Sequence, residues 1–147
     1  GDFLGFLAGK GIEVDYTGLD LNPRLIEAAR EKHPGSTFRV FDIDRDTLDG
    51  KFDYIVLCGV FNLRVEGLDE TIRRTLKILF DHCTIGLAFN ALSSHDPRKD
   101  FELHYVSPEE IFSFAVTHLS PYVSLRHDRM LYDFTLCIHR EPNRFTI

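Results

Sequence analysis

The sequence predicts an α/β fold, a three-layer α/β/α sandwich around a mostly parallel sheet with an antiparallel strand at its carboxyl-terminal end. Strand-like apolar runs alternate with helix-like segments along most of the chain, as they do in βαβ units. The last two strand-like segments, residues 122–126 and 134–140, are joined only by residues 127–133. That link is too short for a crossover helix, so these two strands should be antiparallel.

The composition is that of one folded domain, which we expect to span residues 1–147. The chain is 44% hydrophobic and 27% charged, and its formal net charge is -6. This acidic balance argues against binding to nucleic acid and favours a small-molecule partner. No apolar run approaches the roughly 20 residues of a membrane span, and no signal peptide is visible. We therefore expect a cytoplasmic protein with no membrane partner, and no sequence feature sets its oligomeric state.

The three cysteines, Cys58, Cys83 and Cys137, lie in apolar runs and form no CxxC pair. This pattern predicts buried free thiols in a reducing compartment. The seven histidines include no HxxxH pair, so the sequence predicts no metal site.

The first third of the chain contains two helix signals and two strand signals. Asn22 can cap a helix and Pro23 suits the first helical position, whereas Gly9-Lys10-Gly11 ends the helix before it. The expected elements are a helix over residues 2–10, a strand over 12–20, a helix over 23–32 and a strand over 37–42.

The rest of the chain continues the alternation. The run FDYIVLC is almost continuously apolar, which is typical of a parallel strand buried on both faces. Ser107-Pro108-Glu109-Glu110 combines a cap, a proline and a glutamate three residues after the serine, which together mark a helix start. The expected elements are strands over residues 52–58 and 83–90, a helix over 68–80, a polar connection over 91–105, and a helix from Ser107 to Leu119.

One acidic residue closes the first predicted strand. In the stretch GLDLNP, Asp20 follows an apolar run and comes just before the helix signal of Asn22 and Pro23. A carboxylate at the end of a strand, before a helix, is well placed to accept hydrogen bonds from the two hydroxyls of a ribose. We therefore expect Asp20 to hold a nucleotide-like cofactor.

This layout resembles the class I S-adenosylmethionine-dependent methyltransferases, which have a Rossmann-like fold. In that family an acidic residue closes the second strand, an aspartate after the third strand contacts the adenine amino group, and a loop after the fourth strand lies under the methionine part. Asp20 in GLDLNP, Asp42 in VFDID and the segment Leu57–Asn62 match these features in order. The terminal β-hairpin is also a mark of the family.

The resemblance implies an enzyme that uses S-adenosyl-L-methionine and releases S-adenosyl-L-homocysteine. Gly1 matches the last glycine of the family's glycine-rich loop, and Leu21 and Ile43 match the positions that enclose adenine. The family's first strand and most of that loop have no counterpart here, so we expect further residues before Gly1. The implied cofactor-binding residues are Gly1, Asp20, Leu21, Asp42, Ile43, Cys58 and Gly59.

Methyl transfer is a direct displacement from a sulfonium, so the protein supplies alignment and an apolar pocket rather than a nucleophile. A general base is needed when the acceptor is a hydroxyl or a protonated amine, and His95, His104 and Tyr105 are candidates. Arg64 or Arg98 suits an acidic acceptor. The candidate acceptor residues are Phe61, Asn62, Arg64, Asn90, His95 and Tyr105; no catalytic residue is identified.

Two other functions fit the same residues. An NAD(P)-dependent oxidoreductase also uses an acidic ribose contact, and the spacing from Gly1 to Asp20 suits either family. A catalytically inactive methyltransferase-like binding module is the non-enzymatic alternative.

Overall fold

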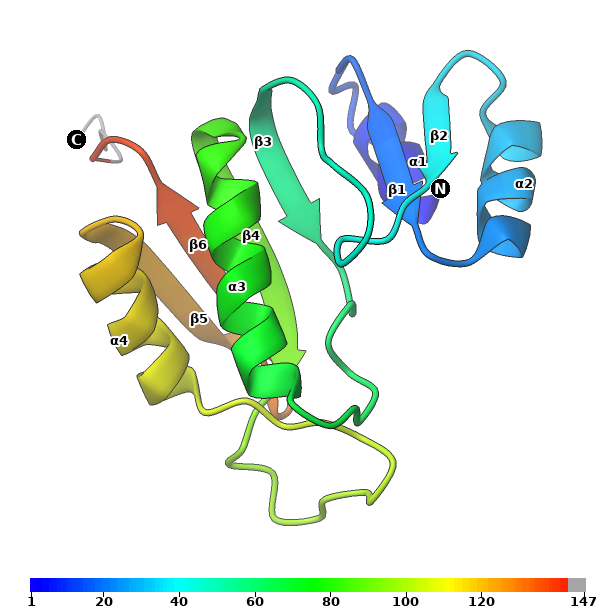
Figure 1. Ribbon diagram of the computed structural model, residues 1–147. Helices are drawn as coiled ribbons and strands as arrows, with labels where there is room; N and C mark the ends of the chain where they lie inside the picture. Colours follow the sequence, from blue (N-terminus) through cyan, green and yellow to red (C-terminus); the bar gives the residue numbers. More distant parts are fainter. Residues whose placement is uncertain (143–147) are drawn as a thin grey trace. The chain divides into compact units, whose positions relative to one another are not determined.

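Two parallel strand pairs organise the structure, and they belong to two different sheets (Figure 1). The structure is a computed structural model that describes residues 1–142. The chain divides into two units, Gly1–Leu48 and the residues from Asp49 onward, and each is described by itself. None of the described helices is long and apolar enough to cross a membrane.

The first unit consists of α1 (Asp2–Gly9), β1 (Thr17–Asp20), α2 (Pro23–Lys32) and β2 (Thr37–Val40). β1 and β2 are parallel, and α2 is the crossover that parallel pairing requires. The predicted helix start is confirmed: the Asn22 side chain accepts a hydrogen bond from the Arg24 N–H at 3.0 Å, and Pro23 occupies the first turn.

The core of this unit is small. Ile26 and Ala29 on α2 pack with Phe38 on β2, and Leu4 and Tyr16 lie against them. Arg30 then secures the strand to the helix, because its Nη2 and Nε donate to the Phe38 carbonyl at 2.7 and 3.1 Å.

Both strands of this unit are shorter than predicted. The strand expected over 12–20 begins at Thr17, because the register with β2 starts with Thr17 opposite Thr37. Ile12 and Val14 are consequently exposed. The strand expected over 37–42 ends at Val40, because Asp42 begins a turn in which its carbonyl accepts from the Asp46 N–H at 2.7 Å.

The second unit holds four strands in the order β3-β4-β6-β5. β3 and β4 are parallel, whereas β6 is antiparallel to both of its neighbours, which confirms the predicted antiparallel end. α3 and α4 cover one face of this sheet (Figure 1). The elements are β3 (Phe52–Leu57), α3 (Leu68–Asp81), β4 (Cys83–Leu92), α4 (Pro108–His118), β5 (Tyr122–Met130) and β6 (Asp133–His139).

Alternation along β6 builds the core of the second unit. Phe134, Leu136 and Ile138 are fully buried, as the period-two pattern predicts. The Phe134 ring meets Phe89 on β4 edge-on, with ring centroids 6.3 Å apart. Phe89 meets Phe61 in the same way at 6.0 Å, so an aromatic row runs from β6 to the segment after β3.

The link between the last two strands is shorter than predicted. β5 continues to Met130 and β6 begins at Asp133, which leaves only Leu131 and Tyr132 in the turn. An irregularity between Arg126 and Met130 lets β5 extend past the point where its regular pairing ends. β4 is also longer than predicted, because its regular pairing with β6 continues to Leu92, which lies opposite Asp133.

The prediction of buried cysteines is wrong for Cys58. This residue directly follows β3 and is exposed, whereas Cys83 is buried in β4 and Cys137 in β6 is only half-buried. Burial raises the pKa of the Cys83 thiol, which keeps it in the unreactive protonated form.

Substitution of Gly18 by alanine should destabilise the first unit. A Cβ at this position would lie 2.4 Å from Cδ1 of Phe38, so the buried ring would have to move. We expect a loss of about 1–3 kcal/mol in the free energy of unfolding, measured by amide hydrogen exchange on α2. Gly35→Ala is the control, because a Cβ there meets nothing within 4 Å. Equal protection in both variants would contradict this packing.

Candidate functional site

In the first unit, two predicted acidic residues lie at one edge. β1 and β2 run in the same direction, Asp20 is opposite Val40, and the Phe41 N–H donates to the Asp20 carbonyl at 3.0 Å. Asp20 and Asp42 therefore both lie at the carboxyl ends of neighbouring parallel strands, where α/β sheets bind their ligands.

The Asp20 side chain is exposed and held in place by the turn that follows it. Its Oδ1 accepts from the Asn22 N–H at 2.8 Å. A carboxylate has about four lone-pair sites, so this contact leaves capacity for two further donors. Leu21 beside it has 65% of its surface exposed. An exposed apolar side chain next to an oriented carboxylate suits a ligand that combines a flat ring with hydroxyl groups.

Asp42 organises its own turn. Its Oδ1 accepts from the Asp44 N–H at 3.0 Å, its Oδ2 lies 3.5 Å from Arg45 Nε, and its N–H donates to Asp46 at 2.8 Å. These contacts fix the backbone of the segment that carries Ile43, which is half-buried. An adenine contact from Asp42 or Ile43 stays a prediction.

Gly1 lies at the N-terminus of α1, close to the end of α2. Its carbonyl accepts from His33 Nε2 at 3.0 Å, and a Cβ on Gly1 would lie 2.9 Å from the same ring. The hydrogen bond and ion pair with Lys32 at 2.8 Å hold the pKa of the Asp2 carboxyl below its usual value. The start of α1 is thus tied to the end of α2, and a role of Gly1 toward a cofactor stays a prediction.

In the second unit, two successive side-chain hydrogen bonds fix the loop after β3. The Gly59 N–H donates to Asn90 Oδ1 at 2.8 Å, and Asn90 Nδ2 donates to Asp133 at 3.0 Å. Gly59 has a φ of +64°, which favours glycine. These two hydrogen bonds join β3, β4 and β6 at the point where the loop of Cys58 and Gly59 begins. Asn90 uses both amide atoms within the fold, which the sequence did not indicate.

Two other predicted acceptor residues point inward. Phe61 is buried in the aromatic row described above, so its ring lies in the core rather than at the surface. The Asn62 carbonyl accepts from the His104 N–H at 3.0 Å. Its side-chain Oδ1 is buried and has no hydrogen-bond partner within the described residues.

The connection after β4 brings a histidine and a glutamate together. His95 Nε2 donates to Glu109 Oε1 at 2.6 Å, and the His127 ring lies edge-on to the His95 ring with centroids 6.2 Å apart. Ser107 donates to the other Glu109 oxygen at 3.1 Å. Hydrogen bonds from its own backbone N–H, from His95 and from Ser107 lower the pKa of the Glu109 carboxyl. The sequence identified Glu109 only as part of a helix start.

The other candidates of this connection have structural partners. The Tyr105 hydroxyl accepts from the Asp100 N–H at 2.9 Å, and the Lys99 ammonium lies 5.7 Å from its ring centroid. His104 is mostly buried and donates from Nε2 to Asp69 at 3.1 Å. The His104–Asp69 contact ties the connection to α3, whereas the Tyr105 contacts lie within the connection.

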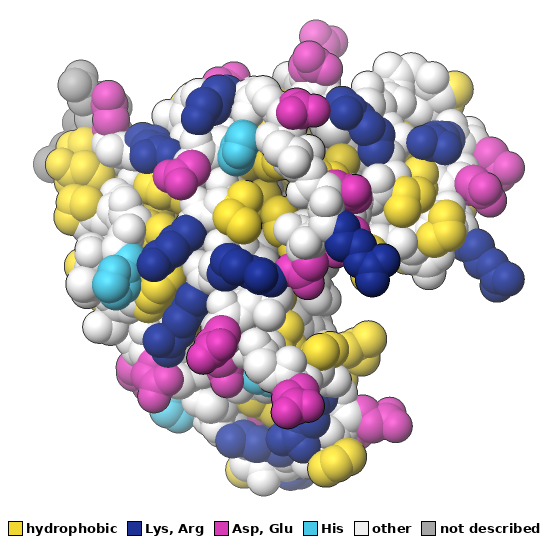
Figure 2. Space-filling view, viewed as in Figure 1, with side chains coloured by type: hydrophobic (Ala, Val, Ile, Leu, Met, Phe, Trp, Pro, Cys, Tyr) yellow, Lys and Arg dark blue, Asp and Glu magenta, His cyan; other side chains and the backbone are white. Residues whose placement is uncertain are grey.

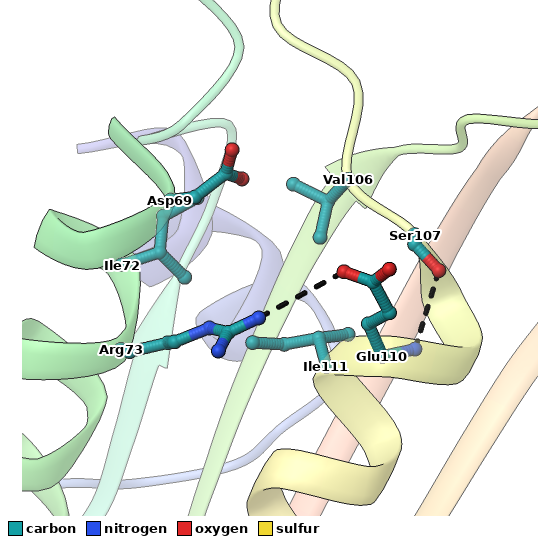
Figure 3. A pocket seen from close by; sticks show the side chains of 7 residues that line it. All are labelled: Asp69, Ile72, Arg73, Val106, Ser107, Glu110 and Ile111. Carbon is teal, nitrogen blue, oxygen red and sulfur yellow. Dashed lines mark hydrogen bonds and ion pairs between the residues drawn. The ribbon is translucent and has the colours of Figure 1, made fainter. Parts of the chain in front are cut away.

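A cavity lies between the starts of α3 and α4, but it is too small for an acceptor. Its volume is about 20 Å³, which accommodates about one water molecule. In Figure 3, Arg73 and Glu110 face each other across it, with an N–O distance of 3.8 Å. No group of three or more possible metal ligands occurs among residues 1–142.

Comparison with known proteins identifies relatives of this chain. The sequence profile described as a methyltransferase domain matches residues 1–86. The Mycobacterium tuberculosis protein Rv1506c, provisionally named a methyltransferase, is 32% identical over 146 residues, which cover 95% of this chain and 87% of that protein.

Solved structures share the fold at low identity. A S-adenosylmethionine-dependent methyltransferase from Clostridium acetobutylicum is 12% identical with a TM-score of 0.68, over 95% of this chain and 79% of that one. The Synechocystis magnesium protoporphyrin IX methyltransferase, crystallised with S-adenosylmethionine, is 15% identical with a TM-score of 0.63, over 85% of this chain. The match spans only 59% of the Synechocystis enzyme.

Removal of the His95 imidazole should raise the pKa of Glu109. Because the pKa of Glu109 is lower in the folded state, the ionised carboxylate stabilises the fold at pH values above the ordinary glutamate pKa. This stabilisation is lost as the pH falls through the lowered pKa. NMR titration of the Glu109 carboxyl should show an upward shift in His95→Gln and none in His118→Gln, whose residue lies at the other end of α4. An unchanged Glu109 titration in His95→Gln would contradict the pairing.

Proposed function

This chain belongs to the methyltransferase domain family, and we propose that it transfers the methyl group of S-adenosyl-L-methionine to a small-molecule acceptor and releases S-adenosyl-L-homocysteine. The observation that carries this proposal is the exposed Asp20 carboxylate at the end of β1, next to the exposed Leu21 and one strand away from Asp42.

The residues of the first unit fit the nucleoside part of this cofactor. Asp20 is oriented by the Asn22 N–H, so its remaining lone pairs are available for both ribose hydroxyls. Leu21 and Ile43 follow the ends of neighbouring strands and supply apolar contact for the adenine ring. Asp42 holds the turn that carries Ile43 and supplies the acceptor for the adenine amino group. We assign Gly1 to the methionine carboxylate.

The second unit supplies the loop after β3. The resemblance assigns Cys58 and Gly59 to the methionine part, and in the structure the Gly59 backbone is fixed by Asn90. The bound cofactor brings the electrophilic methyl carbon, and the protein aligns it with the acceptor. Asn62 and Asn90 lie at this end of the strands, and Asn90 uses its amide within the fold.

We propose His95 as the general base where the acceptor must lose a proton. An ionised Glu109 carboxylate can accept hydrogen bonds but cannot donate them, so His95 must carry its proton on Nε2. This fixes the tautomer in which Nδ1 has a free lone pair, and the Glu109 carboxylate stabilises the imidazolium once Nδ1 has taken the proton. Tyr105 and Arg64 are the other side chains assigned to the acceptor.

The environment of the protein is proposed from its surface and thiols. The formal net charge of -6 favours a small acceptor over nucleic acid. Cys58, Cys83 and Cys137 are free, which supports a reducing compartment, and we propose the cytoplasm.

Asp20→Ala should weaken the binding of S-adenosylhomocysteine to the full-length protein. Loss of a carboxylate from two hydroxyls costs about 1–3 kcal/mol, a roughly 5- to 150-fold rise in Kd. Asp20→Asn should weaken cofactor binding nearly as much. Its amide oxygen can still accept from the Asn22 N–H, but the charge that strengthens the hydrogen bonds to the ribose is lost. Calorimetry measures both variants against the control Asp15→Ala, whose residue lies before β1 and is exposed.

The same titrations separate the alternative functions. Tight binding of NADH with no binding of S-adenosylhomocysteine would indicate an oxidoreductase, and no binding of either cofactor would indicate an inactive binding module. Equal affinity of Asp20→Ala and Asp15→Ala would remove Asp20 from the ribose site.

A further inference from the structure

We propose that the methyl acceptor has an apolar body and an anionic group, and that it binds a surface of the second unit formed by Val60, Leu63, Arg64, Val65 and Phe101. We call these residues the acceptor surface. The acceptor identity rests on the proposed function, whereas the binding of an apolar anion to this surface is tested independently of it.

Two segments that follow different strands join to make this surface. The Arg64 N–H donates to the Glu102 carbonyl at 2.9 Å, and the His104 N–H donates to the Asn62 carbonyl at 3.0 Å. Leu63 and Leu103 form an antiparallel bridge. The segment after β3 and the connection after β4 are therefore held side by side, at the carboxyl ends of two parallel strands.

The surface exposes large apolar side chains that the core does not use. The exposed fractions are 60% for Val60, 69% for Leu63, 62% for Val65 and 82% for Phe101. Figure 2 shows hydrophobic side chains projecting over the two segments, in the lower part of the view. Large exposed apolar patches mark binding sites, and backbone pairing holds together the two segments that carry these side chains.

A single cation within the surface indicates the charge of the ligand. The Arg64 guanidinium carbon lies 5.0 Å from the Phe101 ring centroid, and Nη1 donates to the Phe101 carbonyl at 3.3 Å. Arginine has five N–H donors, and among residues 1–142 no carboxylate forms an ion pair with Arg64. The remaining donors suit a carboxylate, sulfonate or phosphate group. The charge of Arg64 contrasts with the net charge of -6 of the chain.

The position of the surface favours the acceptor over another occupant. Ligands of open α/β sheets bind outside the carboxyl ends of the strands, and both segments begin there. The basic side chains that gather over α3 and α4 in Figure 2 lie on a helical face instead, where Arg73 and Lys77 stack on Phe114. At the strand ends, Arg64 lies over one of the exposed apolar side chains, Phe101.

A pair of fluorescent probes tests the proposal. 8-Anilinonaphthalene-1-sulfonate has an aromatic body with an anionic group, and N-phenyl-1-naphthylamine has the same body without the charge. We expect the sulfonate to bind the wild-type protein more tightly than the amine. Arg64→Gln should weaken sulfonate binding by about tenfold and leave amine binding unchanged. The double substitution Leu63→Ser and Phe101→Ser should weaken both probes.

Leu131→Ser is the matched control, because Leu131 is 78% exposed in the β5–β6 turn, and it should change neither affinity. Absence of sulfonate binding, or equal affinities in all variants, would overturn the proposal. So would a dimer in sedimentation that dissociates in the Leu63→Ser and Phe101→Ser protein, because a second copy would then occupy the surface. S-adenosylhomocysteine should bind all variants equally. If the wild-type protein does not bind S-adenosylhomocysteine, the proposed function is overturned, whereas the result with the two probes still stands.

Discussion

Parallel strand pairing is the constraint on which the rest of this structure depends. Each parallel pair needs a crossover helix, and each brings the carboxyl ends of two strands to one edge. In the first unit this edge carries Asp20 and Asp42, and α2 closes the crossover. In the second unit it carries the loop of Gly59 beside Asn90. Within each unit, candidate residues that are distant in sequence lie at the same sheet edge because of strand direction.

The residues at these edges also hold the fold. Asp20 accepts from Asn22, Asp42 closes its own turn, and Asn90 joins the loop after β3 to β6. A side chain that is fixed before a ligand binds loses less conformational entropy on binding. We interpret these contacts as preorganisation of the proposed cofactor contacts.

Features encoded by local chemistry could be predicted from the sequence. The helix starts at Asn22 and Ser107 depend on capping groups within three residues, and both are present. The antiparallel hairpin followed from a short link. Strand lengths could not be predicted, because the strand at Thr17 begins where β2 offers a partner. The division of the strands into two sheets is likewise a long-range property.

The same distinction holds for the candidate site. Asp20 was identified by its position between a strand and a helix, which is a local signal. Phe61 was assigned to the acceptor, but its ring packs against Phe89, a contact between segments distant in sequence. Glu109 was identified only as a helix-start residue, and its pairing with His95 depends on how the connection after β4 folds back.

The most direct test is a crystal structure of the full-length protein with S-adenosylhomocysteine. We expect both ribose hydroxyls to lie within hydrogen-bond distance of the Asp20 carboxylate, with Leu21 against the adenine ring. Ribose hydroxyls bound by other residues, with the Asp20 carboxylate turned to solvent, would contradict it.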